Sequence, residues 1–236
     1  WGPMAAERSS QMRHLSPELM STLRFAFLMI FIAFSSVGVR AGELQNSEVN
    51  STTAQLAAAL ARVTHMSASF TQLTTDRTLR VLQENTGYLW VNPGAKFRIE
   101  TSAPVEQMLV SNGQDFWVYD ADLEQVIISK LEVDVGQVPI LLLGGHLETI
   151  DASYSVSYFE DELGDNYVLS PLSSESLFTS LSVSFQQSLP VRIAILDALG
   201  QRTLISLTDV SVDDEIESSL FDFVPPAGTD IIDDRF

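Results

Sequence analysis

Between Gly87 and Gln125 the chain alternates short apolar runs with turn-forming residues. The apolar runs are residues 89–91, 97–99, 108–110 and 116–119. The breaks between them are Pro93-Gly94, residues 102–104 and Asn112-Gly113. Asn-Gly between two β-rich runs is a strong hairpin signal. The pattern therefore predicts four consecutive antiparallel strands with an apolar face that other parts of the chain must cover.

The same alternation continues on both sides of this stretch. In residues 66–75, Ala68 and Phe70 fall on one side of a predicted strand and small polar residues fall on the other. Residues 78–85 are predicted to pair with it. Further strands are predicted at residues 126–128, 154–159, 167–170, 177–185, 191–196 and 203–212. About eleven short strands at regular spacing favour an antiparallel barrel or a strongly curled sheet in a single domain.

Two segments have a helical pattern instead. Leu56, Leu60 and Val63 fall on one face of a predicted helix, which we expect to pack on the core. Residues 51–53 can cap its start. Residues 138–146 combine a proline, a run of branched apolar residues and a glycine pair, which predicts a short helix, with a strand as the alternative. This second segment is either a buried part of the core or a mobile lid.

Residues 1–41 have the order of a secretory signal. A positive charge precedes an apolar core over residues 25–34, and Val39 and Ala41 are the small residues before a cleavage point. We therefore predict a signal peptide with an uncertain start over 1–41 and one domain over 42–236 that works outside the cytoplasm. A transmembrane anchor is the alternative, but this apolar core is shorter than the ~20 residues that a spanning helix needs.

The charge balance and the residue types exclude several classes of function. The chain has 13 Lys and Arg against 31 Asp and Glu, a net charge of −18, which argues against nucleic acid or an anionic membrane surface as a partner. It has no cysteine, so we expect no thiolate metal site, no thiol nucleophile and no lipid anchor on an N-terminal cysteine. His14, His65 and His146 have no second ligand at metal spacing, and no G-x-S-x-G motif is present. We therefore predict no enzyme activity, no metal and no cofactor.

What remains is an incompletely covered β-structure that is rich in large apolar side chains. Small barrels of this kind enclose apolar ligands. A lipid or another apolar molecule is therefore the ligand that we expect.

Several short motifs follow one another along the chain in a fixed order and spacing. They are residues 68–72 (ASFTQ), 87–90 (GYLW), Pro93-Gly94, Phe97-Arg98, 111–113 (SNG), 117–120 (WVYD), 124–126 (EQV), 138–142 (VPILL) and 221–228 (FDFVPPAG). Each motif alone is weak. Together they resemble the LolA family of periplasmic outer-membrane lipoprotein carriers, over residues 51–233.

The resemblance implies an unclosed antiparallel β-barrel with a helical lid over a hydrophobic cavity. It also implies a monomer in the periplasm that takes outer-membrane lipoproteins from the inner-membrane LolCDE transporter, shields their acyl chains and delivers them to the receptor LolB. LolB is itself a lipoprotein with an N-terminal cysteine, so a chain without cysteine favours the soluble carrier. The alternative is a periplasmic lipid-sensing or regulatory module with the same barrel, and a lipid-cleaving enzyme is a third reading.

Seven apolar residues are the predicted lining of the acyl-chain cavity and its lid: Phe70, Leu89, Phe97, Ile99, Ile140, Leu141 and Leu143. Core packing is the alternative role for each of them. The resemblance also places Phe97 near the mouth of the cavity as a loading contact. On that basis Phe97→Glu is expected to disturb loading and to leave the fold intact.

Asn92 marks a departure from the family pattern. The family has an arginine directly before the Pro-Gly turn, and this arginine is thought to hold the lid closed. Asn92 stands at that lid-lock position, and its side chain has neither the charge nor the reach of an arginine. We therefore expect the closed form of this chain to depend more on the apolar packing of residues 140–143.

Overall fold

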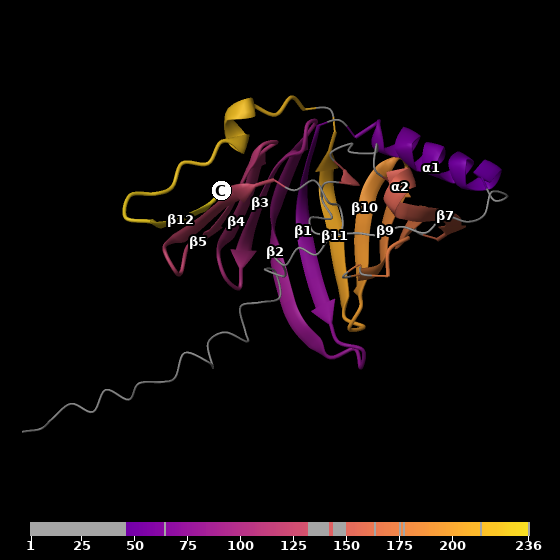
Figure 1. Cartoon of the computed structure of the whole chain (residues 1–236), viewed down its shortest axis with the longest axis horizontal. Coiled ribbons are helices and arrows are strands. Elements are labelled where there is room, and N and C mark those ends of the chain that lie inside the picture. Colours follow the sequence, from indigo (N-terminus) through magenta and orange to yellow (C-terminus); the bar gives the residue numbers. More distant parts are fainter. Residues whose placement is uncertain are drawn as a thin grey trace, which may run out of the picture. The chain divides into compact units, whose positions relative to one another are not determined.

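The computed structural model describes residues 46–235, except for 64, 132–141, 144–149, 163, 175, 177 and 213, and for 46–51 and 151 it describes the backbone alone. A single sheet of twelve strands forms most of this part of the chain (Figure 1). Its strand order is β12-β6-β5-β4-β3-β2-β1-β11-β10-β9-β8-β7. Within the described residues β7 and β12 each pair along one side only, so the sheet is unclosed. No helix in this part of the chain is long and apolar enough to cross a membrane.

The strands are β1 (Met66–Thr75), β2 (Val81–Asn92), β3 (Lys96–Ala103), β4 (Gln107–Asn112), β5 (Asp115–Asp120), β6 (Gln125–Lys130), β7 (Tyr154–Asp161), β8 (Gly164–Pro171), β9 (Phe178–Gln186), β10 (Leu189–Asp197), β11 (Arg202–Ser211) and β12 (Asp230–Asp234). The described helices are α1 (Asn46–Leu60), α2 (Ile150–Ser153) and the 3-10 helix η3 (Ser218–Phe221). Neighbouring strands are antiparallel, except for β6 and β12, which run parallel.

The mainly β, unclosed fold is confirmed, and the number of strands is corrected from about eleven to twelve. The unpredicted strand is β12, in which aspartates flank Ile231 and Ile232 and all side chains are exposed. It lacks the alternation that indicates a half-buried strand. Residues 78–85 and 89–91, predicted as two strands, fall largely within the single strand β2, because Gly87 lies inside the ladder and not in a turn.

The helix α1 packs on the core as predicted, but it begins earlier than its pattern indicated. Its first residue is Asn46, so residues 51–53 lie inside the helix and the predicted cap is wrong. Serine and threonine cost a helix only about 0.5 kcal/mol each relative to alanine, and the helix continues through them. Leu56 and Leu60 are buried in the same apolar cluster as the sheet.

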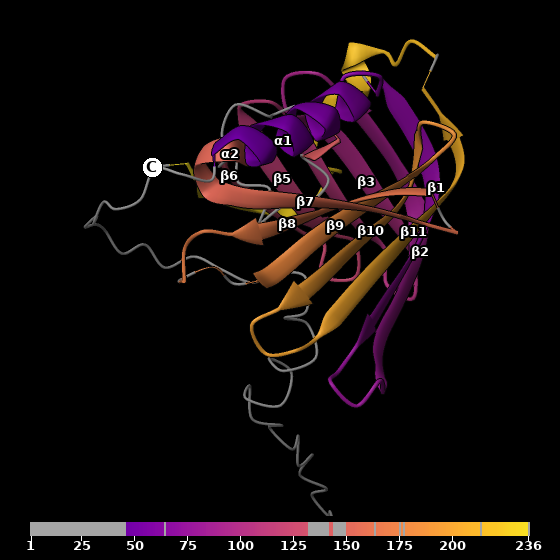
Figure 2. The same ribbon diagram turned by 90° about the vertical axis from the view of Figure 1, so that its right-hand side faces the viewer.

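One face of the sheet carries a continuous set of buried apolar side chains, and we call it the inner face. Phe70 of β1 lies on this face opposite Leu207 of β11, and neighbouring strands continue the set in register. The helix α1 crosses the inner face, as Figure 2 shows. The main core of the described domain therefore lies between the inner face and α1.

The opposite face, which we call the outer face, carries a second apolar cluster on β4, β5 and β6. Its buried members are Val110, Trp117, Val126 and Ile128. We call residues 214–229, which follow β11, the C-terminal strap. Phe223 of the strap packs against this cluster, with its ring centroid 5.5 Å from that of Tyr119. The strap therefore covers this part of the outer face before β12 joins the edge of the sheet (Figure 1).

Gly87→Ala is expected to destabilise the fold. A methyl group at Gly87 would stand 1.9 Å from the carbonyl oxygen of Glu100 and 2.9 Å from Cε1 of Phe70. Overpacking of this kind costs about 1–3 kcal/mol, so the urea midpoint should fall. Thr86→Ala, at the exposed position before it, should change the free energy of unfolding by less than about 0.5 kcal/mol. Equal stability of the two variants would contradict the close approach of β2 and β3 at Gly87.

Candidate functional site

The predicted lining residues that the structure describes lie together on the inner face. Four of them lie on the neighbouring strands β1, β2 and β3, and the segment before α2 adds a fifth. The buried members are Phe70, Leu89, Phe97 and Leu143, at 6%, 2%, 1% and 0% exposed, and Ile99 packs half-buried against them. Ile140 and Leu141 lie outside the described residues. Contact of these side chains with a ligand stays a prediction.

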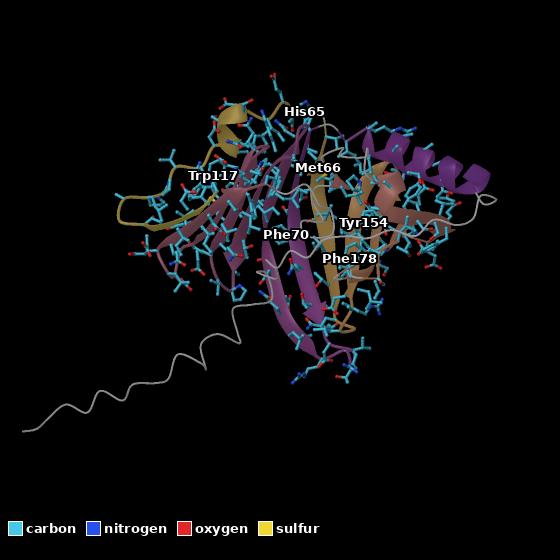
Figure 3. All side chains as sticks on the ribbon, in the orientation of Figure 1. His65, Met66, Phe70, Trp117, Tyr154 and Phe178 are labelled. Atoms are coloured by element: carbon cyan, nitrogen blue, oxygen red, sulfur yellow. The ribbon has the colours of Figure 1, made fainter. Side chains whose placement is uncertain are left out.

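The inner face also extends over strands that the sequence analysis did not assign to the lining. β7, β8 and β9 contribute two aromatic pairs to the same cluster. The rings of Tyr154 and Phe178 stack with centroids 5.9 Å apart, and those of Tyr167 and Phe185 meet edge to face at 6.0 Å. Figure 3 shows Tyr154 and Phe178 on the β7 and β9 side and Phe70 on the β1 side. The alternation of residues 154–159 was the available signal for this half of the face.

Two leucines of the predicted lid lie in the same cluster. Leu142 and Leu143 are 0% exposed, as is Ile150 at the start of α2. Together with α1 they bury the apolar side chains of the inner face. The rest of the predicted lid, including Pro139 and the pair Gly144-Gly145, lies outside the described residues. Leu142 and Leu143 are therefore part of the core, and the movement of this segment as a lid stays a prediction.

The inner face changes from apolar to polar along β1 and β2. Gln72, Thr74 and Asn85 are all buried there, at 3%, 5% and 4% exposed. Asn85 Oδ1 accepts a hydrogen bond from Gln83 Nε2 at 3.2 Å, and the hydroxyl oxygens of Thr74 and Thr203 are 3.2 Å apart. Burying these polar groups under hydrocarbon would be costly. An apolar ligand therefore fits the other half of these strands, which carries the buried side chains of Phe70 and Leu89.

Asn92, the predicted lid-lock position, lies at the end of β2 beneath the C-terminal strap. It is 6% exposed, and its Nδ2 donates a hydrogen bond to the carbonyl oxygen of Ile216 at 3.3 Å. Its Oδ1 lies 2.8 Å from Nδ1 of His65. Because an amide oxygen only accepts, His65 Nδ1 carries the proton in this contact. The described contacts of Asn92 thus join the strap to the start of β1, and its effect on the lid stays a prediction.

Arg98 forms a second link to the strap. Its Nε donates to Glu100 Oε1 at 2.6 Å, and its Nη1 donates to the carbonyl oxygen of Leu220 in η3 at 3.3 Å. Its Nη2 lies 2.8 Å from Sδ of Met108. Because an arginine presents several donors in one plane, a single side chain can hold η3 and β4 at once. The outer face is therefore fastened by directional bonds as well as by apolar packing.

The inner face is suited to shielding apolar groups and not to proton transfer. Burial raises the pKa of Tyr167 on this face. Large shifts belong to surface groups: a hydrogen bond from Thr78 lowers the pKa of Asp76 to about 2, and a hydrogen bond to Asp165 raises the pKa of Tyr158 to about 12. The part of the chain that the structure describes holds no group of three metal-ligating side chains. Its inner face thus provides burial for an apolar ligand.

A family of known proteins matches this chain. The family model for "Outer membrane lipoprotein carrier protein LolA" covers residues 61–224. The chain is 35% identical to the outer-membrane lipoprotein carrier protein of Pseudomonas aeruginosa PAO1 over 203 residues, which is 86% of this chain and 96% of that protein. It is 39% identical to the carrier protein of Alcanivorax borkumensis over 168 residues, 71% of this chain and 80% of that protein. This chain belongs to the LolA family.

The match confirms the resemblance that the motifs indicated. For this LolA family member the matched range contains β1 to β11 and the strap up to Val224. A solved structure of a LolA superfamily protein from Nitrosomonas europaea is similar with a TM-score of 0.42 and 11% identity, over 73% of this chain and 98% of that one. The family is named for carrying and not for catalysis, so this LolA family member is not an enzyme.

The burial of Phe97 reverses the expected outcome of Phe97→Glu. The ring is 1% exposed, and its centroid lies 5.8 Å from that of Phe116. A carboxylate there would be buried without a partner, which costs several kcal/mol. Phe97→Glu is therefore expected to unfold at a much lower temperature, followed by circular dichroism. Phe97→Leu keeps an apolar side chain and should lose only about 1–1.5 kcal/mol. If both variants melt together, Phe97 is not part of the core.

Asn92→Ala is expected to lower the free energy of unfolding by about 1–3 kcal/mol. The variant leaves the Ile216 carbonyl and the His65 N–H without their partner in a site with little water. Hydrogen exchange should also become faster in residues 214–222 of the strap. Lys96→Ala, at the position opposite Asn92 on β3, is the matched control and should leave exchange there unchanged. Faster exchange in Lys96→Ala and not in Asn92→Ala would show that the hydrogen bonds of Asn92 do not hold the strap in place.

Proposed function

We propose that this LolA family protein carries outer-membrane lipoproteins and shields their acyl chains on its inner face. One observation carries the proposal: a continuous apolar cluster on an unclosed sheet is covered by α1 and by Leu142 and Leu143. Support also comes from relatives named outer-membrane lipoprotein carrier protein, which align with up to 88% of this chain.

The energetics of acyl chains suit such a carrier. Burying one methylene is worth ~0.8 kcal/mol, so a chain of about fifteen methylenes costs roughly 12 kcal/mol to expose to water. A lipoprotein with several acyl chains therefore does not cross an aqueous space unaided. The inner face offers aliphatic side chains and aromatic rings, which bind methylenes without selecting among acyl chains.

Acyl chains enter this site by exchanging with the apolar cover. When Leu142 and Leu143 leave the inner face, methylenes of the cargo replace the contacts that the leucines lose. Both surfaces are apolar, so the free energy of the exchange is a small difference between two similar terms. A carrier must bind its cargo and then release it to an acceptor. A nearly balanced exchange meets both needs.

The remaining steps of the proposal follow the family resemblance. Residues 1–41 act as a signal peptide, and residues 42–236 work in the periplasm as a monomer. The LolCDE transporter of the inner membrane loads the carrier, and the receptor LolB of the outer membrane receives the cargo. The order of charge, apolar core and small residues before Ala41 supports the first of these steps.

Site-specific photo-crosslinking tests where the acyl chains bind. A photoreactive residue in place of Ile99, which is half-buried on the inner face, is expected to crosslink to lipoprotein acyl chains in cells. Tyr88 is the matched control, because it lies on the neighbouring strand but is 53% exposed on the outer face. It should give no such crosslink. Crosslinks from Tyr88 alone, or from neither position, would remove the inner face as the binding site.

Transfer separates a carrier from a lipid-sensing module. Cells depleted of the protein are expected to retain outer-membrane lipoproteins in the inner membrane. Purified protein loaded with a triacylated lipoprotein should pass it to acceptor membranes that contain the receptor. Binding without transfer, together with normal sorting in depleted cells, would support the regulatory alternative.

A further inference from the structure

The β1–β2 and β10–β11 hairpins end in turns of the same design. Leu79 N donates to the carbonyl oxygen of Asp76 at 2.9 Å, and Gly200 N donates to that of Asp197 at 3.2 Å. In each turn Oδ1 of the opening aspartate also accepts hydrogen bonds from two later backbone N–H groups. The turns are therefore pre-formed, and both project at the same end of the sheet (Figures 1 and 2).

The twin turns differ at the position where the backbone is left-handed. Gly200 has φ +82°, and Leu79, the equivalent residue of the first turn, has φ +65°. Glycine adopts this conformation freely, whereas the Cβ atom of a leucine approaches the following carbonyl oxygen too closely and strains the backbone. A glycine at position 79 would thus serve the fold better than the leucine does. The leucine side chain is 67% exposed, so its benefit has to come from outside the chain.

Leu79 is one of several exposed apolar side chains at the tips of the two hairpins. We call this group the tip patch, and its members are Leu79, Val81, Leu82, Leu196 and Leu199, which are between 36% and 67% exposed. A methyl group added at Gly200 would lie 3.6 Å from Cβ of Arg77, so the two turns lie side by side. Exposed apolar side chains that gather at one end of a protein among polar residues are typical of an interaction site.

The charges around the tip patch are unusual for this chain. Arg77, Arg80 and Arg202 flank the patch and are exposed, although the whole chain has 31 acidic against 13 basic residues. The side chain of Arg80 is 75% exposed, while that of its partner Asp76 is only 23% exposed. Asp76 and Asp197 use their carboxylates to close their own turns. Three exposed arginines therefore stand beside two carboxylates that are bound within their own turns, so the tip is apolar with a small excess of positive charge.

We propose that the tip patch docks this protein on an anionic phospholipid surface. The leucines enter the boundary between headgroups and acyl chains, and the arginines bind the lipid phosphates. The net charge of −18 argues against a broad contact with such a surface, so the contact is confined to the tip patch. The acidic remainder of the protein is repelled and orients the patch toward the membrane. The docking is separate from cargo binding, because it uses the tips of two hairpins and not the apolar cluster of the inner face.

Vesicle flotation of cargo-free protein tests the proposal. The whole chain and each variant are expressed and purified. Mass spectrometry checks that the proteins compared have the same N-terminus. The protein is expected to bind vesicles rich in phosphatidylglycerol, more weakly at high salt, and to bind pure phosphatidylcholine poorly. Leu79→Gly should weaken binding by about tenfold, from the transfer of one leucine side chain, without lowering the midpoint of unfolding. Arg77→Gln with Arg202→Gln should weaken it by about fivefold for each arginine.

Leu123→Ser is the matched control. Leu123 is also a turn leucine, 45% exposed, but it stands between Asp122 and Glu124. Its loss should leave vesicle binding unchanged. The proposal is overturned if the protein does not bind anionic vesicles, or if Leu79→Gly and Leu123→Ser reduce binding equally. Sedimentation tests self-association. If the free protein is a dimer and Leu79→Gly dissociates it, the patch is a dimer interface and the membrane proposal is overturned.

Discussion

An unclosed sheet cannot cover its own apolar face, and the rest of this structure depends on that constraint. A closed barrel or a sandwich would fill the inner face with side chains from its own strands. Here β7 and β12 lie at opposite ends of the strand order, and α1 and Leu142-Leu143 provide the cover. Apolar burial is non-directional, so one apolar surface can replace another. Because the sheet is unclosed, its inner face needs α1 and the two leucines as a cover. For the same reason an apolar ligand can take the place of the leucines.

The two faces of the sheet are covered in physically different ways. The strap on the outer face is fastened by hydrogen bonds to Asn92 and Arg98, and the chain after it is fastened by an ion pair between Arg235 and Asp115 at 3.0 Å. A buried hydrogen bond that opens without a replacement costs the desolvation of both partners. The inner cover packs through leucines, which lose nothing specific if methylenes take their place. The protein thus combines a fixed outer cover with an inner cover that can be displaced.

The elements with strict alternation were predictable from the sequence. The bounds of β1 agree with the predicted residues 66–75, and the inner position of Phe70 follows from the same alternation. The strand β12 was not predictable, because its exposed aspartates leave no buried side to detect. Asn92 and Ile216 are 124 residues apart, so neither pattern nor turn chemistry indicated their contact. Phe97 is the second residue of β3. Its position beside a turn suggested that it lies at the mouth of the cavity, but the register of β3 places its side chain in the core.

The departure at Asn92 follows from this difference between the two covers. The side chain fits between the His65 ring and the Ile216 carbonyl, and it is almost fully buried there. An arginine at this position would have to bury its charge against the strap or displace the strap, and either choice is costly. Position 92 therefore serves the fixed outer cover in this chain, while the described part of the predicted lid packs on the inner face through leucines. With the polar side chain committed to the outer face, the balance between covered and open inner face rests on apolar contacts, which an acyl chain can replace directly.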